Sequence, residues 1–93
     1  MEKVNVVLVK HPNYNGQFMF RAPDGTKLTA GQRVLCDTSR GPCEMGTCVT
    51  DSFELFDYQL SQLWNTKIEK LKPVVGMLKP IMFVHTRYDD EDR

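Results

Sequence analysis

The sequence predicts a small α+β domain: an antiparallel, partly open β-barrel or twisted sheet with one α-helix in its C-terminal half. Three observations lead to this fold class. The chain has 93 residues, the length of one domain. Its first half alternates short apolar segments with turn-forming residues, and near Phe56 the apolar spacing changes to that of a helix. The expected order is β-β-β-β-α-β.

Four strands are expected in the first fifty residues, over 4–10, 17–21, 31–38 and 44–50. Turn formers separate them, over 11–16, 22–25 and 39–42. The first strand is rich in valine and apolar on both alternating faces, which is typical of a central strand covered on both sides. In the second strand, Phe18 and Phe20 share one face. Gly46, inside the fourth strand, indicates a bulge or a close backbone approach.

One amphipathic helix is expected to begin after Phe56, with Asp57 as its N-cap, and to end near Lys72, before Pro73. Its apolar stripe has spacings of three and four and consists of Leu60, Leu63, Trp64, Ile68 and Leu71. Extended chain follows over 74–78 and 81–86. The single domain is therefore expected to span residues 1–88, and residues 89–93 are expected to form an acidic, disordered tail.

Composition limits the classes of function. Twelve basic residues balance twelve acidic ones, so no global field attracts phosphate, although a local basic patch remains open. No apolar run approaches the roughly 20 residues of a membrane span, and the apolar run over 6–9 is too short for a signal peptide. We therefore expect a cytoplasmic protein with no membrane partner. Three cysteines, an odd count, favour reduced thiols over a disulfide framework.

One segment resembles a known family. Its pattern is Leu-x-x-Gly-x-x-Val-x-x-x-Thr-x-x-Gly, followed by a glycine and a valine, and it comprises Leu28, Gly31, Val34, Thr38, Gly41, Gly46 and Val49. This spacing resembles small SH3-like barrels, and within them the conserved C-terminal region of the polymerase-suppressor protein family. The similarity covers residues 28–49 and departs from the family at Pro42 and at the cysteines. It implies an SH3-like barrel and no particular activity.

No catalytic motif stands out, so we expect a non-enzymatic protein with no cofactor and no small-molecule substrate. His11 and His85 are interpreted as solvated or hydrogen-bonded side chains, because neither has a partner motif. The cysteines leave an alternative open, a zinc-stabilised or thiol-dependent module built on Cys36, Cys43 and Cys48. Their gaps do not match a tight zinc knuckle, and buried apolar thiols explain them better.

Two kinds of binding remain. A protein partner, or a second copy of the chain, is expected to contact the sheet edge, the turn at 39–43 and an aromatic region, with Tyr58, Trp64 and Arg40 as candidate residues. The alternative is a nucleic-acid-binding barrel that uses basic and aromatic side chains: Tyr14, Arg21, Lys27, Arg33 and Arg40. The first interpretation is preferred, as a small adaptor, accessory or inhibitor protein of the kind that phages and mobile elements encode.

Overall fold

The four strands expected in the first half are present, and one further strand follows them. The computed structural model describes residues 2–78. Within that range the elements are β1 (Lys3–Lys10), β2 (Phe18–Arg21), β3 (Arg33–Thr38), β4 (Gly41–Cys48), β5 (Phe53–Phe56), α1 (Asp57–Trp64), a 3-10 turn (Ile68–Lys70) and β6 (Val74–Met77). The expected segment 81–86, the tail 89–93 and the domain limit at 88 lie outside the described residues.

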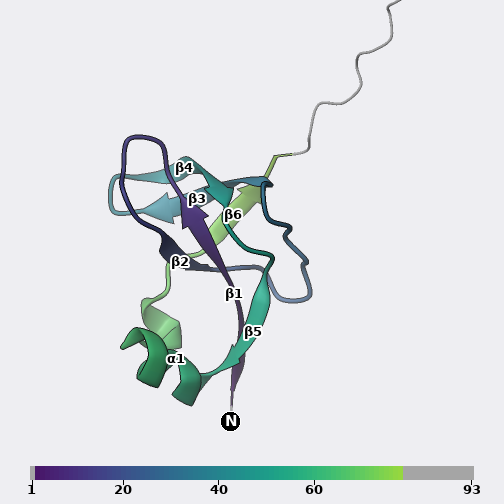
Figure 1. The fold of residues 1–93 in the computed structure, drawn as a ribbon, viewed down its shortest axis with the longest axis vertical. Helices are drawn as coiled ribbons and strands as arrows, with labels where there is room; N and C mark the ends of the chain where they lie inside the picture. Colours follow the sequence, from purple (N-terminus) through teal and green to yellow (C-terminus); the bar gives the residue numbers. More distant parts are fainter. Residues whose placement is uncertain (1, 79–93) are drawn as a thin grey trace, which may run out of the picture.

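The first strand is the centre of the sheet, because it pairs with three others (Figure 1). One edge of β1 is antiparallel to β2. Its other edge pairs with β5 near the start of β1 and with β4 near its end. Strand β4 then pairs with β3, and β3 with β6, which gives the order β2-β1-β4-β3-β6. The prediction of a central strand covered on both faces is confirmed, since both alternating faces bury valines: Val4, Val6, Val7 and Val9.

The sheet is antiparallel and open within residues 2–78. Its edge strands are β2 and β6. A parallel bridge joins Arg21, the last residue of β2, to Pro73, the residue before β6, and the Arg21 N–H donates to the Lys72 carbonyl at 2.9 Å. The rest of β2 has no strand on its outer side in the described part of the chain. The antiparallel sheet with one helix agrees with the expected architecture. The barrel-like, SH3-like part of that expectation is not confirmed, because the described sheet is not closed.

Two apolar clusters form the core. The large cluster lies within the curl of the sheet and contains Val7, Val9, Phe20, Ala22, Leu28, Val34, Cys36, Cys48 and Val74. The small cluster lies beside α1 and contains Val4, Val6, Leu55 and Leu60, with Met19, Phe53, Ile68 and Leu71 packed against it. Since β1 supplies valines to both, it links the two clusters.

The prediction of a long helix was wrong. Helix α1 ends at Trp64 because Asn65 adopts the left-handed conformation, at φ 53°, and donates its N–H to the Ser61 carbonyl. Ile68 and Leu71 therefore reach the small cluster from the 3-10 turn and the residue after it, not from the same helix. Within α1 only Leu60 is buried.

The start of the helix also differs from the prediction, and so does the order of elements. The N-cap is Phe56 and not Asp57: the Phe56 N–H donates to the Gln59 side-chain oxygen at 2.9 Å. Asp57 is the first helical residue, and its carboxylate accepts the Tyr58 N–H.

Strand β5 was not predicted, because its four residues lie directly before the helix and are recognisable as a strand only through their pairing with β1.

Gly46 marks a close approach, as its position indicated. A Cβ there would lie 2.9 Å from Cε1 of His11 and would also collide with Cγ1 of Val9. Strand β4 therefore crosses directly over the His11 imidazole. The register irregularity of this hairpin lies elsewhere, in β3 between Cys36 and Thr38. Within residues 2–78, no helix is long and apolar enough to cross a membrane.

Candidate functional site

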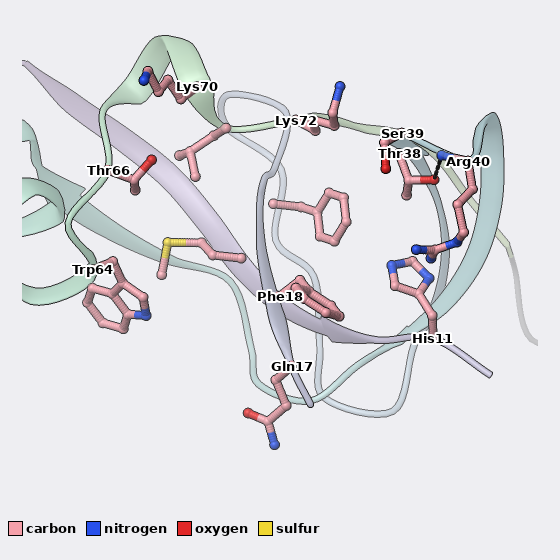
Figure 2. A pocket seen from close by; sticks show the side chains of 13 residues that line it. His11, Gln17, Phe18, Thr38, Ser39, Arg40, Trp64, Thr66, Lys70 and Lys72 are labelled. Carbon is pink, nitrogen blue, oxygen red and sulfur yellow. Dashed lines mark hydrogen bonds between the residues drawn. The ribbon is translucent and has the colours of Figure 1, made fainter. Parts of the chain in front are cut away.

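An open groove of about 450 Å³ lies between the outer edge of β2, the Ser39–Arg40 turn and the chain that follows α1 (Figure 2). Its apolar wall comes from three residues of β2, Phe18, Met19 and Phe20, and from Leu71. Trp64 lies at one end of the groove, and His11 and Arg40 lie at the other. The groove thus brings together residues as far apart in the sequence as His11 and Lys72.

The electrostatic character of the groove is one-sided. Its lining includes Arg40, Lys70 and Lys72 and no aspartate or glutamate. Arg40 is paired with Glu44, whereas Lys70 and Lys72 are exposed and form no ion pair within the described part of the chain. The positive charge available to a ligand therefore comes from the two lysines.

The outer edge of β2 lies beside this groove and, within residues 2–78, has main-chain groups without a strand partner. The Arg21 N–H points away from β1, because it donates to Lys72. Directions alternate along an antiparallel strand, so the N–H and C=O of Met19 also point away from β1. Leu8, opposite Met19 in β1, agrees with this assignment: its carbonyl accepts the Val49 N–H on the other edge, at 2.8 Å.

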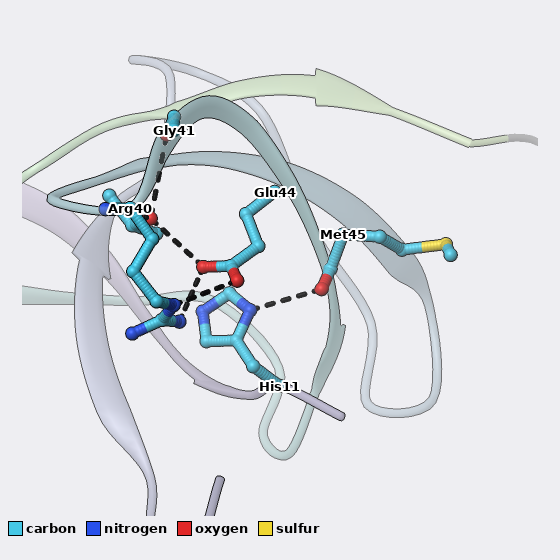
Figure 3. Close-up of polar contacts among 6 residues, drawn as sticks. His11, Arg40, Gly41, Glu44 and Met45 are labelled. Carbon is cyan, nitrogen blue, oxygen red and sulfur yellow. Dashed lines mark hydrogen bonds and ion pairs between the residues drawn. The ribbon is translucent and has the colours of Figure 1, made fainter. Parts of the chain in front are cut away.

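A polar cluster closes one end of the groove (Figure 3). The Arg40 guanidinium forms a two-point ion pair with the Glu44 carboxylate and lies 3.6 Å from the centre of the Tyr14 ring. The Thr38 hydroxyl donates to the same carboxylate at 2.9 Å. Hydrogen bonding to Arg40 lowers the pKa of Glu44 and raises the pKa of Arg40. Arg40 is thus held in place by Glu44 and Tyr14.

His11 lies behind this cluster and is 1% exposed, so of the two expected alternatives, solvated or hydrogen-bonded, the hydrogen-bonded one is observed. Its Nδ1 is 3.0 Å from the Met45 carbonyl, which can only accept a hydrogen bond, so we assign the imidazole proton to Nδ1. Nε2 is buried without a hydrogen-bond partner within residues 2–78. Figure 3 shows this nitrogen on the side of the ring that faces Arg40. No feature of the sequence indicated its burial except Gly46, which makes room for the ring.

The structure brings together two of the three predicted protein-binding residues. Trp64 and Arg40 both line the groove, at opposite ends. Tyr58 does not line it; its ring stacks on Phe56, with centroids 5.8 Å apart. Lys3 also lies over the Phe56 ring.

The five candidate nucleic-acid residues do not form one surface. Tyr14 and Arg40 contact each other, but Arg21 lies 3.9 Å from Asp24. Lys27 is in the loop between β2 and β3, and Arg33 begins β3, at the end opposite the Ser39–Arg40 turn. Within residues 2–78, the only contact among the five that the structure shows is therefore the one between Tyr14 and Arg40.

The three cysteines have different surroundings. Cys36 and Cys48 are buried in the large cluster, whereas Cys43 is exposed. Cys36 is opposite Glu44, so the side chain of Cys43, one residue away, points to the other face. Burial raises the pKa of Cys36 to about 12 and raises that of Cys48. Within residues 2–78, no three histidine, cysteine or acidic side chains gather as metal ligands.

Sequence reasoning missed one wall of the groove. Thr66, Lys70 and Lys72 were expected on a continuous helix, but the turn at Asn65 places them beside β2.

Comparisons with known proteins give no second line of evidence for the role of the groove. The chain matches no protein-family model, no curated protein and no solved structure.

Proposed function

We propose that this chain is a non-enzymatic binding module that holds an extended, acidic segment of a protein partner in the groove, as an added strand along β2. One observation carries the proposal: the main-chain groups of Met19 point out of a sheet edge that is lined by aromatic and basic side chains. Such an edge pairs readily with an extended peptide.

Side chains along the groove supply selectivity. Phe18 is 45% exposed and Trp64 is 40% exposed, so both offer apolar surface to alternate side chains of a bound strand. Lys70 and Lys72 favour carboxylates near that strand. The preferred ligand is therefore a β-prone segment in which apolar and acidic residues occur together.

The same aromatic and basic residues also suit single-stranded nucleic acid. Two observations favour a peptide. The outward N–H and C=O of Met19 match a peptide backbone, and the balanced formal charge supplies no long-range attraction for phosphate. The experiment below therefore has to distinguish peptide binding from binding of single-stranded nucleic acid.

The expected family resemblance and the expected cellular role of the chain are also proposals. The SH3-like, polymerase-suppressor resemblance stays a proposal; of the residues that carry it, Leu28 and Val34 are buried and Gly31 has a positive φ of 92°. Val49, the last residue of that pattern, is exposed. We retain a cytoplasmic accessory or inhibitor protein of a phage or mobile element as the setting in which such a module would act.

The experiment is selection from a displayed library of random ten-residue peptides, followed by affinity measurements on the selected sequences. We expect acidic, β-branched peptides. Met19→Pro removes the outward N–H and leaves the bonds to β1, so affinity should fall five- to tenfold relative to Met19→Ala, since one main-chain hydrogen bond contributes about 1 kcal/mol.

A second test changes the charge of the groove and leaves the main chain of β2 unaltered. The double variant Lys70→Glu and Lys72→Glu should lose about tenfold in affinity, whereas Lys27→Glu, an exposed control outside the groove, should bind as the unaltered chain does. Equal binding by the Met19→Pro and Met19→Ala chains would contradict the proposal. So would a preference for single-stranded DNA that weakens steeply with salt.

A further inference from the structure

We propose that the groove contains a subsite for a primary carboxamide, the side-chain group of asparagine and glutamine, between His11 and Arg40. The proposal rests on the proposed function, because it names one side chain of the peptide that the groove binds. Figure 2 shows the imidazole of His11 and the guanidinium of Arg40 side by side at one end of the groove. Strand addition along β2 requires neither of these two groups.

His11 supplies a hydrogen-bond acceptor that is not satisfied. Nδ1 holds the proton that it donates to the Met45 carbonyl, 3.0 Å away, so Nε2 of the neutral imidazole carries a lone pair. This nitrogen is buried and has no hydrogen-bond partner within residues 2–78. Buried polar atoms nearly always have a partner, and leaving one without a partner is unfavourable. A ligand that donates a hydrogen bond to Nε2 is therefore favoured over one that cannot.

Arg40 supplies donors next to this acceptor. Of the five N–H groups of a guanidinium, the Arg40 side chain directs those on Nε and Nη2 to Glu44. The side chain is 34% exposed, so N–H groups that Glu44 does not use can reach a ligand. Because Glu44 and the Tyr14 ring hold the guanidinium in place, these donors have a fixed position beside Nε2.

A primary carboxamide matches an acceptor that lies beside a donor. Its NH₂ group would donate to Nε2 of His11, and its oxygen would accept from Arg40. A carboxylate has no hydrogen to donate to a neutral imidazole, and an ammonium group has no acceptor for Arg40. Glu44 already neutralises the charge of Arg40, so this end of the groove favours a neutral group. The subsite therefore differs from the end of the groove that carries the lysines.

The subsite lies on one face of the added strand. Phe18 and Phe20 share a face of β2, and their ring centres lie 6.5 and 5.4 Å from the centre of the His11 ring. Met19 points to the opposite face, where it packs against the small cluster. The carboxamide must therefore be on the Phe18 face of the bound strand. It reaches the covered Nε2 by displacing the Phe18 ring, which is 45% exposed and belongs to neither cluster.

The first test uses peptides selected from the displayed library, at about pH 8, where carboxylates are ionised and imidazoles are neutral. We expect the tightest peptides to share an asparagine or glutamine at one position. Replacing that residue by glutamate or by methionine should each weaken binding about tenfold. Lys70 and Lys72 favour carboxylates, so a neutral amide that binds more tightly than glutamate is not a general effect of charge. Serine binding as tightly as the amide would overturn the assignment to a carboxamide.

The second test removes each partner on the protein. The amide peptide and its methionine form should bind equally to Arg40→Met, an exposed change that leaves the core intact, whereas the control Lys72→Met should keep the tenfold difference. His11→Phe, which retains an aromatic ring in the buried position, should also remove the difference; if this chain fails to fold, Arg40→Met decides the question.

Three results are decisive. A tenfold difference that persists in the Arg40→Met chain would overturn the subsite. So would selected peptides without a shared amide position; if Met19→Pro still bound them more weakly than Met19→Ala, the proposed function would stand without the subsite. Equal binding of every peptide by the Met19→Pro and Met19→Ala chains would instead overturn the proposed function.

Discussion

The large and the small cluster differ in what they support. The large cluster is enclosed by the curl of the sheet, and each of its members is at most 5% exposed. The small cluster has a four-residue buried centre, surrounded by side chains that are only partly covered. Of those, Met19 and Leu71 also line the groove. Both clusters therefore contain buried side chains that stabilise the fold, but only the small cluster has the binding surface at its margin.

Thiol reactivity gives the largest expected contrast between the clusters and the surface. Cys43 should react rapidly with iodoacetamide in the native protein, because it is exposed. Cys36 should react at least roughly a thousandfold more slowly, since a pKa of about 12 in place of 9.0 lowers its thiolate fraction by that factor. Mass spectrometry of native and unfolded protein checks this. Fast alkylation of Cys36 or Cys48 in the native state would show that the large cluster opens readily.

Truncation of one leucine in each cluster tests the division of roles directly. Leu28→Ala and Leu60→Ala should each lower the free energy of unfolding by about 3 kcal/mol, because both side chains are fully buried. Only Leu60→Ala should also change Trp64 emission and weaken peptide binding, since Leu60 is the buried residue of the helix that carries Trp64. Denaturant titrations and fluorescence give both quantities. If Leu28→Ala weakened binding equally, the two clusters would not be separable.

The close approach at Gly46 should have a somewhat smaller effect. Gly46→Ala places a methyl group against Val9 and His11, so we expect a loss of about 2 kcal/mol in the free energy of unfolding. Gly41→Ala is the matched control in the same strand, because a Cβ there meets nothing within 4 Å and its φ is not positive. Thermal unfolding of both variants measures the difference. Similar melting temperatures would mean that β4 does not pack over His11.

The Arg40–Glu44 pair should give the smallest effect, because it is accessible to solvent. The pKa of Glu44 is lower in the folded chain than in the unfolded one, so its contribution to stability is present above the ordinary value of 4.5. That contribution is lost as the pH falls through the lower folded value. Glu44→Gln should remove this part of the pH dependence below about pH 4.5, as followed by denaturation between pH 3 and 7. An unchanged profile would refute the assignment.

The sequence predicted those parts of the fold that depend on local patterns. Apolar residues on both faces identified β1 as central, and Gly46 indicated a close approach that the structure confirms. Strand β5 and the end of α1 could not be predicted, because they depend on pairing with β1 and on the left-handed conformation of Asn65. The apolar stripe continued through Ile68, so its period gave no sign of the break.

The candidate site was only partly predictable for the same reason. Trp64 and Arg40 were identified as residue types suited to binding, and the structure places both in the groove. The role of Met19 was not visible, since the direction of a backbone N–H depends on strand order and register. The burial of His11 likewise requires β4 to pass over it.

Amide hydrogen exchange of Met19 tests the central claim most directly. In the unaltered chain without peptide, the Met19 amide should exchange rapidly, while the Phe20 amide, which faces β1, should be protected. Saturation with a peptide selected from the displayed library should slow Met19 exchange at least tenfold and leave Phe20 unchanged. Peptide binding with no added protection at Met19 would contradict strand addition along β2.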